Sequence, residues 1–165
     1  MHEVTDDSGF LAVVVPTTYE GFVDSDWKFD QLLNHFRAQM SRQSLLIWGT
    51  GLAGIWKVEV LLRASRRNGF REVSGPIQVI GGCVLLTNYE SLTMAAQFED
   101  VRLPEPHQKN LLVEVPDGEY RCRVIQMFDP SNAGAVGPGK PDFVVEFARA
   151  GSLPAAWAEI PWFTE

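Results

Sequence analysis

The sequence predicts an α+β fold, built mainly on an antiparallel β sheet or sandwich, with one long amphipathic helix and one short helix. Strand-like apolar segments outnumber helical ones along the chain. They follow one another at short spacing, which favours antiparallel pairing over parallel strands joined by helices. Only one segment carries a clear helical period. The length of 165 residues suits a single domain spanning 1–165.

The first half of the chain holds the strongest helical signal. Residues 10–15 and 17–23 are β-rich and separated by Pro16, and Asp24 or Ser25 offers a cap for the next element. Apolar side chains then recur at helical spacing, at Phe29, Leu32, Leu33, Phe36 and Met40. This period predicts an amphipathic helix whose polar face is solvated.

The middle of the chain reads as a series of strands. Residues 44–48 form a short apolar run, and residues 55–62 alternate with a period of two. Asn68-Gly69 is a tight-turn signal, so residues 70–73 are expected to pair back across it. Two further strands are predicted at 77–80 and 83–87. A capping-box pattern beginning at Thr87 then predicts the short helix.

The last third predicts a hairpin, a loop, a strand and a tail. Residues 111–115 and 119–128 flank Pro116-Asp117-Gly118, which indicates a hairpin. Residues 129–142, rich in Gly and Pro, are expected to form a mobile loop. Residues 143–148 form the last predicted strand. The tail 151–165 is aromatic and has no period.

The chain is acidic, with a net charge of −7. The acids lie toward its two ends, where residues 1–43 hold seven acids against three bases and residues 99–165 hold eleven against six. Such a protein repels nucleic acid and anionic membranes and attracts basic partners. We therefore expect no direct binding to nucleic acid or membrane. The polar, acidic start and the short apolar runs favour the cytoplasm.

Acidic residues form two groups in the sequence. Glu20, Asp24, Asp26 and Asp30 surround the start of the long helix, where carboxylates favour the positive end of the helix dipole. The second group has no such local explanation and is predicted to bind a partner. Together with two tail tryptophans, which either dock on the core or anchor an interface, the predicted partner-binding residues are Glu99, Asp100, Glu105, Glu114, Asp117, Glu119, Trp157 and Trp162.

No catalytic, cofactor or metal site is predicted. Gly49, Gly51 and Gly54 match the dinucleotide fingerprint in spacing, but that site needs a helix after the glycines, and a strand pattern follows here. The histidines are far apart in sequence, and no nucleophile elbow occurs. Cys83 and Cys122 lie in apolar runs and are interpreted as small buried residues.

A cluster of arginines is the one basic feature. Arg63, Arg66, Arg67 and Arg71 surround Asn68-Gly69. A nucleic-acid site would need interleaved aromatic residues and a basic domain. The cluster is therefore interpreted as a solvated hairpin tip, with contact to an acidic partner or a second copy of the chain as the alternative.

Residues 111–124, Leu-Leu-Val-Glu-Val-Pro-Asp-Gly-Glu-Tyr-Arg-Cys-Arg-Val, resemble a hairpin of small bacterial inhibitor proteins. With the acidic, strand-rich chain around it, the whole resembles cytoplasmic immunity proteins that neutralise secreted nuclease toxins, the competence-protein-J type of nuclease inhibitor. The resemblance implies an antitoxin that binds its cognate enzyme in the producing cell. It assigns a role to no particular residue.

The sequence thus favours a non-enzymatic inhibitor of a basic toxin, most simply a DNase. Two alternatives remain open: a small cytoplasmic enzyme or ligand-binding domain with a hidden pocket, and a self-associating structural domain. The oligomeric state is not predicted.

Overall fold

The computed structural model describes residues 1–132 and 138–163. The elements in chain order are β1 (His2–Asp6), β2 (Phe10–Val14), α1 (Phe29–Ser41), β3 (Leu45–Gly49), β4 (Gly54–Leu61), β5 (Arg71–Val79), β6 (Cys83–Asn88), α2 (Tyr89–Gln97), the 3-10 helix η1 (Pro106–Leu111), β7 (Leu112–Glu114), β8 (Gly118–Gln126) and β9 (Phe143–Ala148). The predicted α+β class is confirmed.

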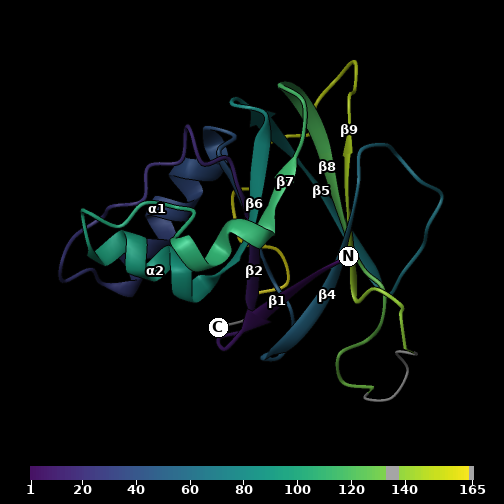
Figure 1. Cartoon of the computed structure of the whole chain (residues 1–165), viewed down its shortest axis with the longest axis horizontal. Helices are drawn as coiled ribbons and strands as arrows, with labels where there is room; N and C mark the ends of the chain where they lie inside the picture. Colours follow the sequence, from purple (N-terminus) through teal and green to yellow (C-terminus); the bar gives the residue numbers. More distant parts are fainter. Residues whose placement is uncertain (133–137, 164–165) are drawn as a thin grey trace.

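Three layers make up the molecule (Figure 1). A five-stranded sheet in the order β1-β4-β9-β8-β5 packs face to face on a four-stranded sheet in the order β3-β2-β6-β7. Helices α1 and α2 cover the other face of the four-stranded sheet. Every strand pair is antiparallel except β4 with β9. The predicted sandwich is therefore present, with the helices as a third layer.

Two apolar cores hold the layers together. The core between the sheets contains Trp48, Phe143 and Phe147, each no more than 1% exposed. The core between the four-stranded sheet and the helices contains Phe36 and Leu92. Because β2 and β3 lie between both cores, all their side chains except Phe10 are buried. The continuous apolar runs in these two strands follow from burial on both faces.

Helix α1 begins where the apolar period begins, but its cap is not the predicted one. Neither Asp24 nor Ser25 caps it; Lys28 occupies the N-cap, and its backbone N–H donates to Gln31 Oε1 at 2.7 Å. For α2 the cap is Asn88 rather than Thr87, since Asn88 Oδ1 accepts from the Ser91 N–H at 2.9 Å. Both corrections are short shifts along the chain, and at α1 the side chain of Gln31, not that of the N-cap residue, makes the capping bond.

Two predicted strand features are wrong, and one strand was missed. Residues 17–23 form no strand; they turn and run along α2, where the Val23 N–H donates to the Ala96 carbonyl at 2.9 Å. The segments 70–73 and 77–80 join into the single strand β5, which pairs with β8 and not back onto β4. Strand β1, which was not predicted, forms an edge of the five-stranded sheet beside β4.

The predicted 111–128 hairpin is also wrong. Its two halves form the strands β7 and β8, but β7 pairs with β6 in one sheet while β8 pairs with β5 and β9 in the other. The turn at Pro116-Asp117 therefore carries the chain from one sheet to the other. Corners of this kind are usual in sandwiches, and their turn residues resemble those of hairpins.

Part of the predicted loop 129–142, residues 133–137, lies outside the described residues, as do residues 164 and 165 of the predicted tail. The described part of the tail runs along the sandwich and contacts both cores. Among the described residues, no helix combines the length and apolar character needed to cross a bilayer.

Candidate partner-binding surface

Three of the predicted acids gather at one corner of the sandwich. Glu114 ends β7 opposite Cys83, and Glu119 lies on β8 opposite Gln78. Between them, Asp117 Oδ1 accepts the backbone N–H of Gly82 at 2.7 Å. All three side chains are exposed. We call Glu114, Asp117 and Glu119 the acidic corner.

Hydrogen bonds to the segment that crosses between the sheets fix the backbone of the acidic corner. The Tyr120 hydroxyl donates to the Pro116 carbonyl at 2.6 Å, and Arg149 donates to the Asp117 carbonyl at 2.8 Å. The Arg149 guanidinium also lies 5.1 Å from the centre of the Tyr120 ring. These bonds fix the backbone of the turn, while the carboxylates of Glu114 and Glu119 extend into solvent. The corner is therefore an acidic surface on a rigid support.

The other three predicted acids lie elsewhere. Glu99 and Asp100 are exposed just after α2. Glu105 is half-buried at the start of η1, where its backbone N–H donates to Gln108 Oε1 at 3.0 Å and its carboxylate lies 3.4 Å from His107. Glu105 thus has a structural role at a helix start. Its part in partner binding stays a prediction.

The structure places one acid of the first sequence group beside Glu99. The turn after β2 lies against α2 so closely that a Cβ on Gly21 would stand 3.0 Å from the Ala95 Cβ. This packing brings Glu20 and Glu99 to the same cavity, which has a volume of about 420 Å³. Glu20 forms an ion pair with Arg42 at 2.9 Å. Residues far apart in the sequence thus share one surface.

The helix dipole accounts for fewer of the acids near the start of α1 than the sequence predicted. Only Asp30 lies in the first turn of α1. Asp24 instead accepts the backbone N–H of Asp26 at 2.9 Å in a local turn, and Asp26 lies 3.7 Å from Lys28. Asp24 and Asp26 are both exposed, and neither lies in the first turn of the helix.

His35 lies on helix α1, whose polar face was predicted to be solvated. It is half-buried beside Tyr19, with Nε2 3.4 Å from the phenol oxygen. Burial lowers the pKa of His35 below its ordinary value of 6.5, and the nearby Glu20 carboxylate opposes this effect. Burial likewise raises the pKa of the Tyr19 phenol. At neutral pH the pair is uncharged.

The lowered pKa of His35 makes the stability of the folded protein depend on pH. Because the folded-state pKa of His35 is lowered, the unfolded chain binds the proton first as pH falls below about 6.5, and stability is lost there. The wild type is expected to lose more unfolding free energy between pH 7.5 and 5.5 than His35→Gln does. Urea titrations at the two pH values measure this loss of unfolding free energy. Equal losses in the wild type and in His35→Gln would contradict the role of His35.

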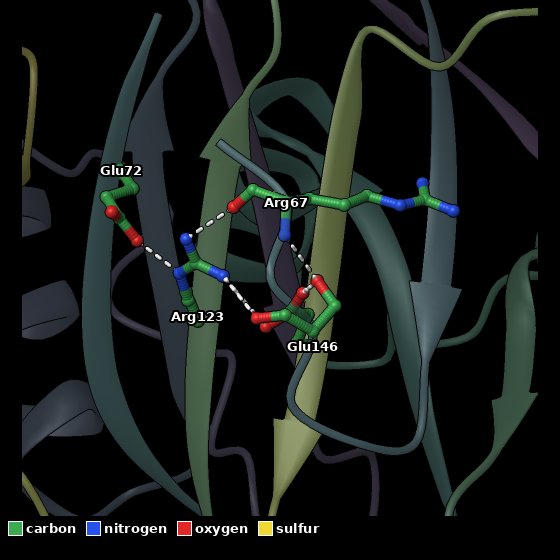
Figure 2. A network of polar contacts seen from close by, with 5 residues as sticks. Arg67, Glu72, Arg123 and Glu146 are labelled. Atoms are coloured by element: carbon green, nitrogen blue, oxygen red, sulfur yellow. Dashed lines mark hydrogen bonds and ion pairs between the residues drawn. The ribbon is translucent and has the colours of Figure 1, made fainter. Parts of the chain in front are cut away.

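The arginine-bearing segment lies over the outer face of the five-stranded sheet instead of at a hairpin tip (Figure 2). Arg123 of β8 reaches up from the sheet and donates to the Arg67 carbonyl at 2.7 Å and the Ser65 carbonyl at 3.3 Å. The Arg67 side chain forms two hydrogen bonds with Glu59 on β4, at 2.5 and 3.1 Å. The predicted solvated tip is thus wrong for Arg67.

Two carboxylates complete this network. Glu146 on β9 is 1% exposed; it accepts from Arg123 at 3.2 Å and from the Ser65 hydroxyl. Glu72 on β5 pairs with Arg123 on the solvent side, and this contact holds the pKa of Glu72 below its ordinary value. The cluster ties three strands to the segment above them. Each charge has a partner of opposite sign, so the arrangement fits a structural role.

The two tail tryptophans pack on the body of the protein. The Trp157 indole N–H donates to the Ser74 carbonyl at 2.8 Å, and a Cβ on Gly75 would stand 2.7 Å from the Trp157 ring. The Trp162 ring lies 4.4 Å from the Arg71 guanidinium, and its carbonyl closely approaches Gly49. Packing accounts for both positions. Their partner-binding role stays a prediction.

The glycine motif and the cysteines have structural roles. Strand β4 begins at Gly54, so the glycines open a strand and not the helix that a dinucleotide site needs. Both cysteines are free; Cys122 is fully buried, which raises the pKa of its thiol, and Cys83 is half-buried. Over residues 1–132 and 138–163, no cluster of three or more His, Cys, Asp or Glu side chains has metal-site geometry.

Sequence reasoning missed the buried polar residues. Asp6 is 1% exposed; its Oδ1 accepts three backbone N–H groups of the following turn, and its Oδ2 accepts from Thr50 and Trp56. Gln108 is also buried, and its Nε2 donates to the hydroxyl oxygens of Thr87 and Ser91. The sequence around Asp6 gives no sign of two of its partners, because Thr50 and Trp56 lie more than 40 residues away along the chain.

Comparison with known proteins gives a fold relationship. No protein-family model and no curated protein matches the chain. A structure described as crocagin biosynthetic gene J superimposes with a TM-score of 0.57 at 13% identity, covering 89% of this chain and 92% of that chain. ComJ from Bacillus subtilis, an inhibitor of the DNA-degrading activity of NucA, superimposes with a TM-score of 0.52 at 8% identity, covering 90% of this chain and 94% of that one.

Identities this low show a common fold alone. The chain shares its architecture, nearly end to end, with a nuclease inhibitor. The fold expected from the resemblance is therefore found.

Proposed function

We propose that the protein is an immunity protein that binds a basic nuclease in the producing cell and blocks it by a protein–protein interface. The observation that carries the proposal is the shared fold with ComJ, a nuclease inhibitor, over 90% of this chain and 94% of the other. The exposed acids support the same class of partner, because a nuclease must be electropositive where it holds phosphate.

The acidic corner is the part of the surface we assign to this contact. Its carboxylates stand on a backbone fixed by Tyr120 and Arg149, so binding a partner does not have to order this part of the backbone. Charges of opposite sign on two partners speed their encounter, from about 10⁵–10⁶ M⁻¹s⁻¹ toward 10⁸ M⁻¹s⁻¹ or more at low salt. Tight and rapid capture suits a protein that must stop a nuclease before it reaches the chromosome.

The test begins with the partner. The protein is immobilised, exposed at low ionic strength to an extract of the cells that produce it, and washed with rising salt. We expect a basic protein to elute, to hydrolyse DNA, and to lose that activity when one equivalent of the free protein is returned. An eluted partner that cleaves no nucleic acid, or whose cleavage is unaffected, would overturn the proposal.

Charge reversal tests the surface. Glu114→Lys with Glu119→Lys is expected to slow association with the captured nuclease about tenfold or more and to weaken its salt dependence, because the steering field is lost. Asp117 is left intact, since it also bonds to Gly82. Association rates are measured by stopped-flow fluorescence at several salt concentrations.

The matched control reverses two exposed acids away from the corner, Glu3→Lys with Asp7→Lys. Both double variants change the net charge by the same amount. A slowing equal to that of the corner variant would show that only net charge matters and would remove the corner from the interface.

A further inference from the structure

The Asn68-Gly69 motif, which predicted a tight turn, lies within the arginine-bearing segment above the five-stranded sheet. Residues 64–69 form neither helix, strand nor turn. Close packing on β8 accounts for the glycine, because a Cβ at Gly69 would stand 2.6 Å from the Gln126 carbonyl oxygen and 2.7 Å from the Ile125 side chain. This packing gives no reason for the asparagine that precedes it.

Asn68 has no structural partner. It is exposed, and within residues 1–132 and 138–163 neither its carboxamide nor the Gly69 N–H forms a hydrogen bond. The exposed Asn34 on α1 differs, because its Oδ1 accepts from the Arg37 guanidinium at 3.0 Å. The Asn68 carboxamide is therefore able to rotate toward the nitrogen of Gly69, and that nitrogen has no hydrogen bond to give up.

An asparagine followed by glycine can close a cyclic imide, because glycine places no Cβ beside the attacking nitrogen. The Gly69 nitrogen loses its proton and bonds to Cγ of Asn68. The bond from Cγ to Nδ2 then breaks, and ammonia leaves with that proton. Water adds to one of the two imide carbonyls and opens the ring. The products are aspartate and isoaspartate, in which the main chain runs through Cβ and Cγ.

The charges near Asn68 favour the first step of this reaction. The deprotonated amide and the intermediate that follows it are anionic, and nearby cations stabilise an anion. Arg67 contributes little, since Glu59 pairs with it. Arg66 and Arg71 form no ion pair in the part of the chain that the structure describes, and Arg66 is exposed. The unpaired charges closest to Asn68 in the sequence are therefore both positive.

We propose that Asn68 is a site of spontaneous deamidation in the folded protein, and that its isoaspartyl product loosens the arginine-bearing segment. The segment is attached on both sides of Asn68: the Arg67 carbonyl accepts from Arg123 at 2.7 Å, and the Phe70 N–H donates to the Gln126 carbonyl at 2.8 Å. Isoaspartate lengthens the main chain by one carbon atom between these attachments, so they cannot both keep their geometry. The proposal is independent of the partner of the protein.

Peptide mass spectrometry of protein kept warm at neutral pH for several weeks tests the site, and an isoaspartyl methyltransferase detects the product. Asn68 is expected to convert about tenfold or more faster than Asn34 and Asn110, which are exposed but are followed by His35 and Leu111. Asn68→Gln removes the isoaspartyl signal. Conversion at Asn68 in urea but not in the folded protein would overturn the proposal, because the fold would then protect this residue.

Urea unfolding and amide hydrogen exchange test the loosening. The isoaspartyl form is expected to unfold at lower urea than the wild type and to exchange the Phe70 amide faster. The matched control is Asn68→Asp, which carries the same charge on a main chain of ordinary length and is expected to behave like the wild type. Gly69 is not replaced, because a Cβ there would meet Gln126. Equal unfolding midpoints for the isoaspartyl form and Asn68→Asp would overturn the loosening.

Discussion

Arg123→Ala is expected to lower the free energy of unfolding by about 3–5 kcal/mol, the usual loss when one member of a buried ion pair is removed. The variant leaves Glu146, which is 1% exposed, with the Ser65 hydroxyl but without a cation. It also leaves the carbonyls of Ser65 and Arg67 without their donor. The segment above the sheet would lose two of its attachments and keep those of Ser65 to Glu146 and of Arg67 to Glu59.

Urea unfolding followed by circular dichroism measures this loss. The matched control is Arg121→Ala on the same strand, where the arginine is exposed, and a change within about 0.5 kcal/mol is expected there. Replacing the pair together, by Arg123→Met with Glu146→Leu, is expected to recover much of the stability, because no buried charge remains unpaired. A loss below about 1 kcal/mol in Arg123→Ala would show that water reaches Glu146 and that the network is not structural.

Trp157→Ala is expected to cost about 3 kcal/mol, because the ring fills the space above Gly75 and contacts both cores. Its hydrogen bond to the Ser74 carbonyl also caps a polar group on the outer edge of β5. Trp157→Phe keeps most of the apolar contact and loses the N–H donor. A cost of about 1 kcal/mol is expected for that change.

Thermal and urea unfolding of both variants, with the exposed Phe70→Ala as control, test this assignment. The partner-binding role predicted from the sequence gives the opposite pattern: Trp157→Ala would retain wild-type stability and lose affinity for the captured nuclease. A stability loss without an affinity loss would assign Trp157 to the core alone. The two properties are measured on the same samples, so the outcomes are separable.

The elements that were predicted well are those with a strong local signal. The apolar period from Phe29 to Met40 identified α1, and a helix over Leu92, Ala95 and Ala96 is present as α2. Strands β4, β6 and β9 lie where alternating or apolar runs indicated them. In each case the pattern reflects which faces are buried, because a buried face of a helix or strand requires apolar residues at regular intervals along the sequence.

The errors concern both the pairing of strands and the local conformation of a few segments. The chain bends at Pro116-Asp117, but the strands that it joins there belong to different sheets, and at Asn68-Gly69 the predicted tight turn does not form. A turn sequence does not decide strand pairing, because the choice between a hairpin and a crossing to the second sheet depends on burial over the whole chain. The 17–23 segment failed for a related reason: its apolar residues pack on α2 as a turn instead of pairing as a strand.

The candidate site shows the same division. The excess of acidic residues follows from the composition, and the proposed class of partner rests on it. The grouping of Glu114, Asp117 and Glu119 could not, because β7 and β8 belong to different sheets. The cavity joins Glu20 to Glu99, which local patterns had assigned to separate groups.

By itself, the sequence determined the α+β class, the long helix and most strands, and its charge led to the proposal of a basic partner, since periodicity and charge are properties of neighbouring residues and of their sum. Tertiary structure decided which strands pair, that the arginine segment is tied down over Glu146, and which acids share a surface. These depend on contacts between residues far apart in the chain, such as Arg123 with Glu72 and Glu146, and no local pattern encodes them.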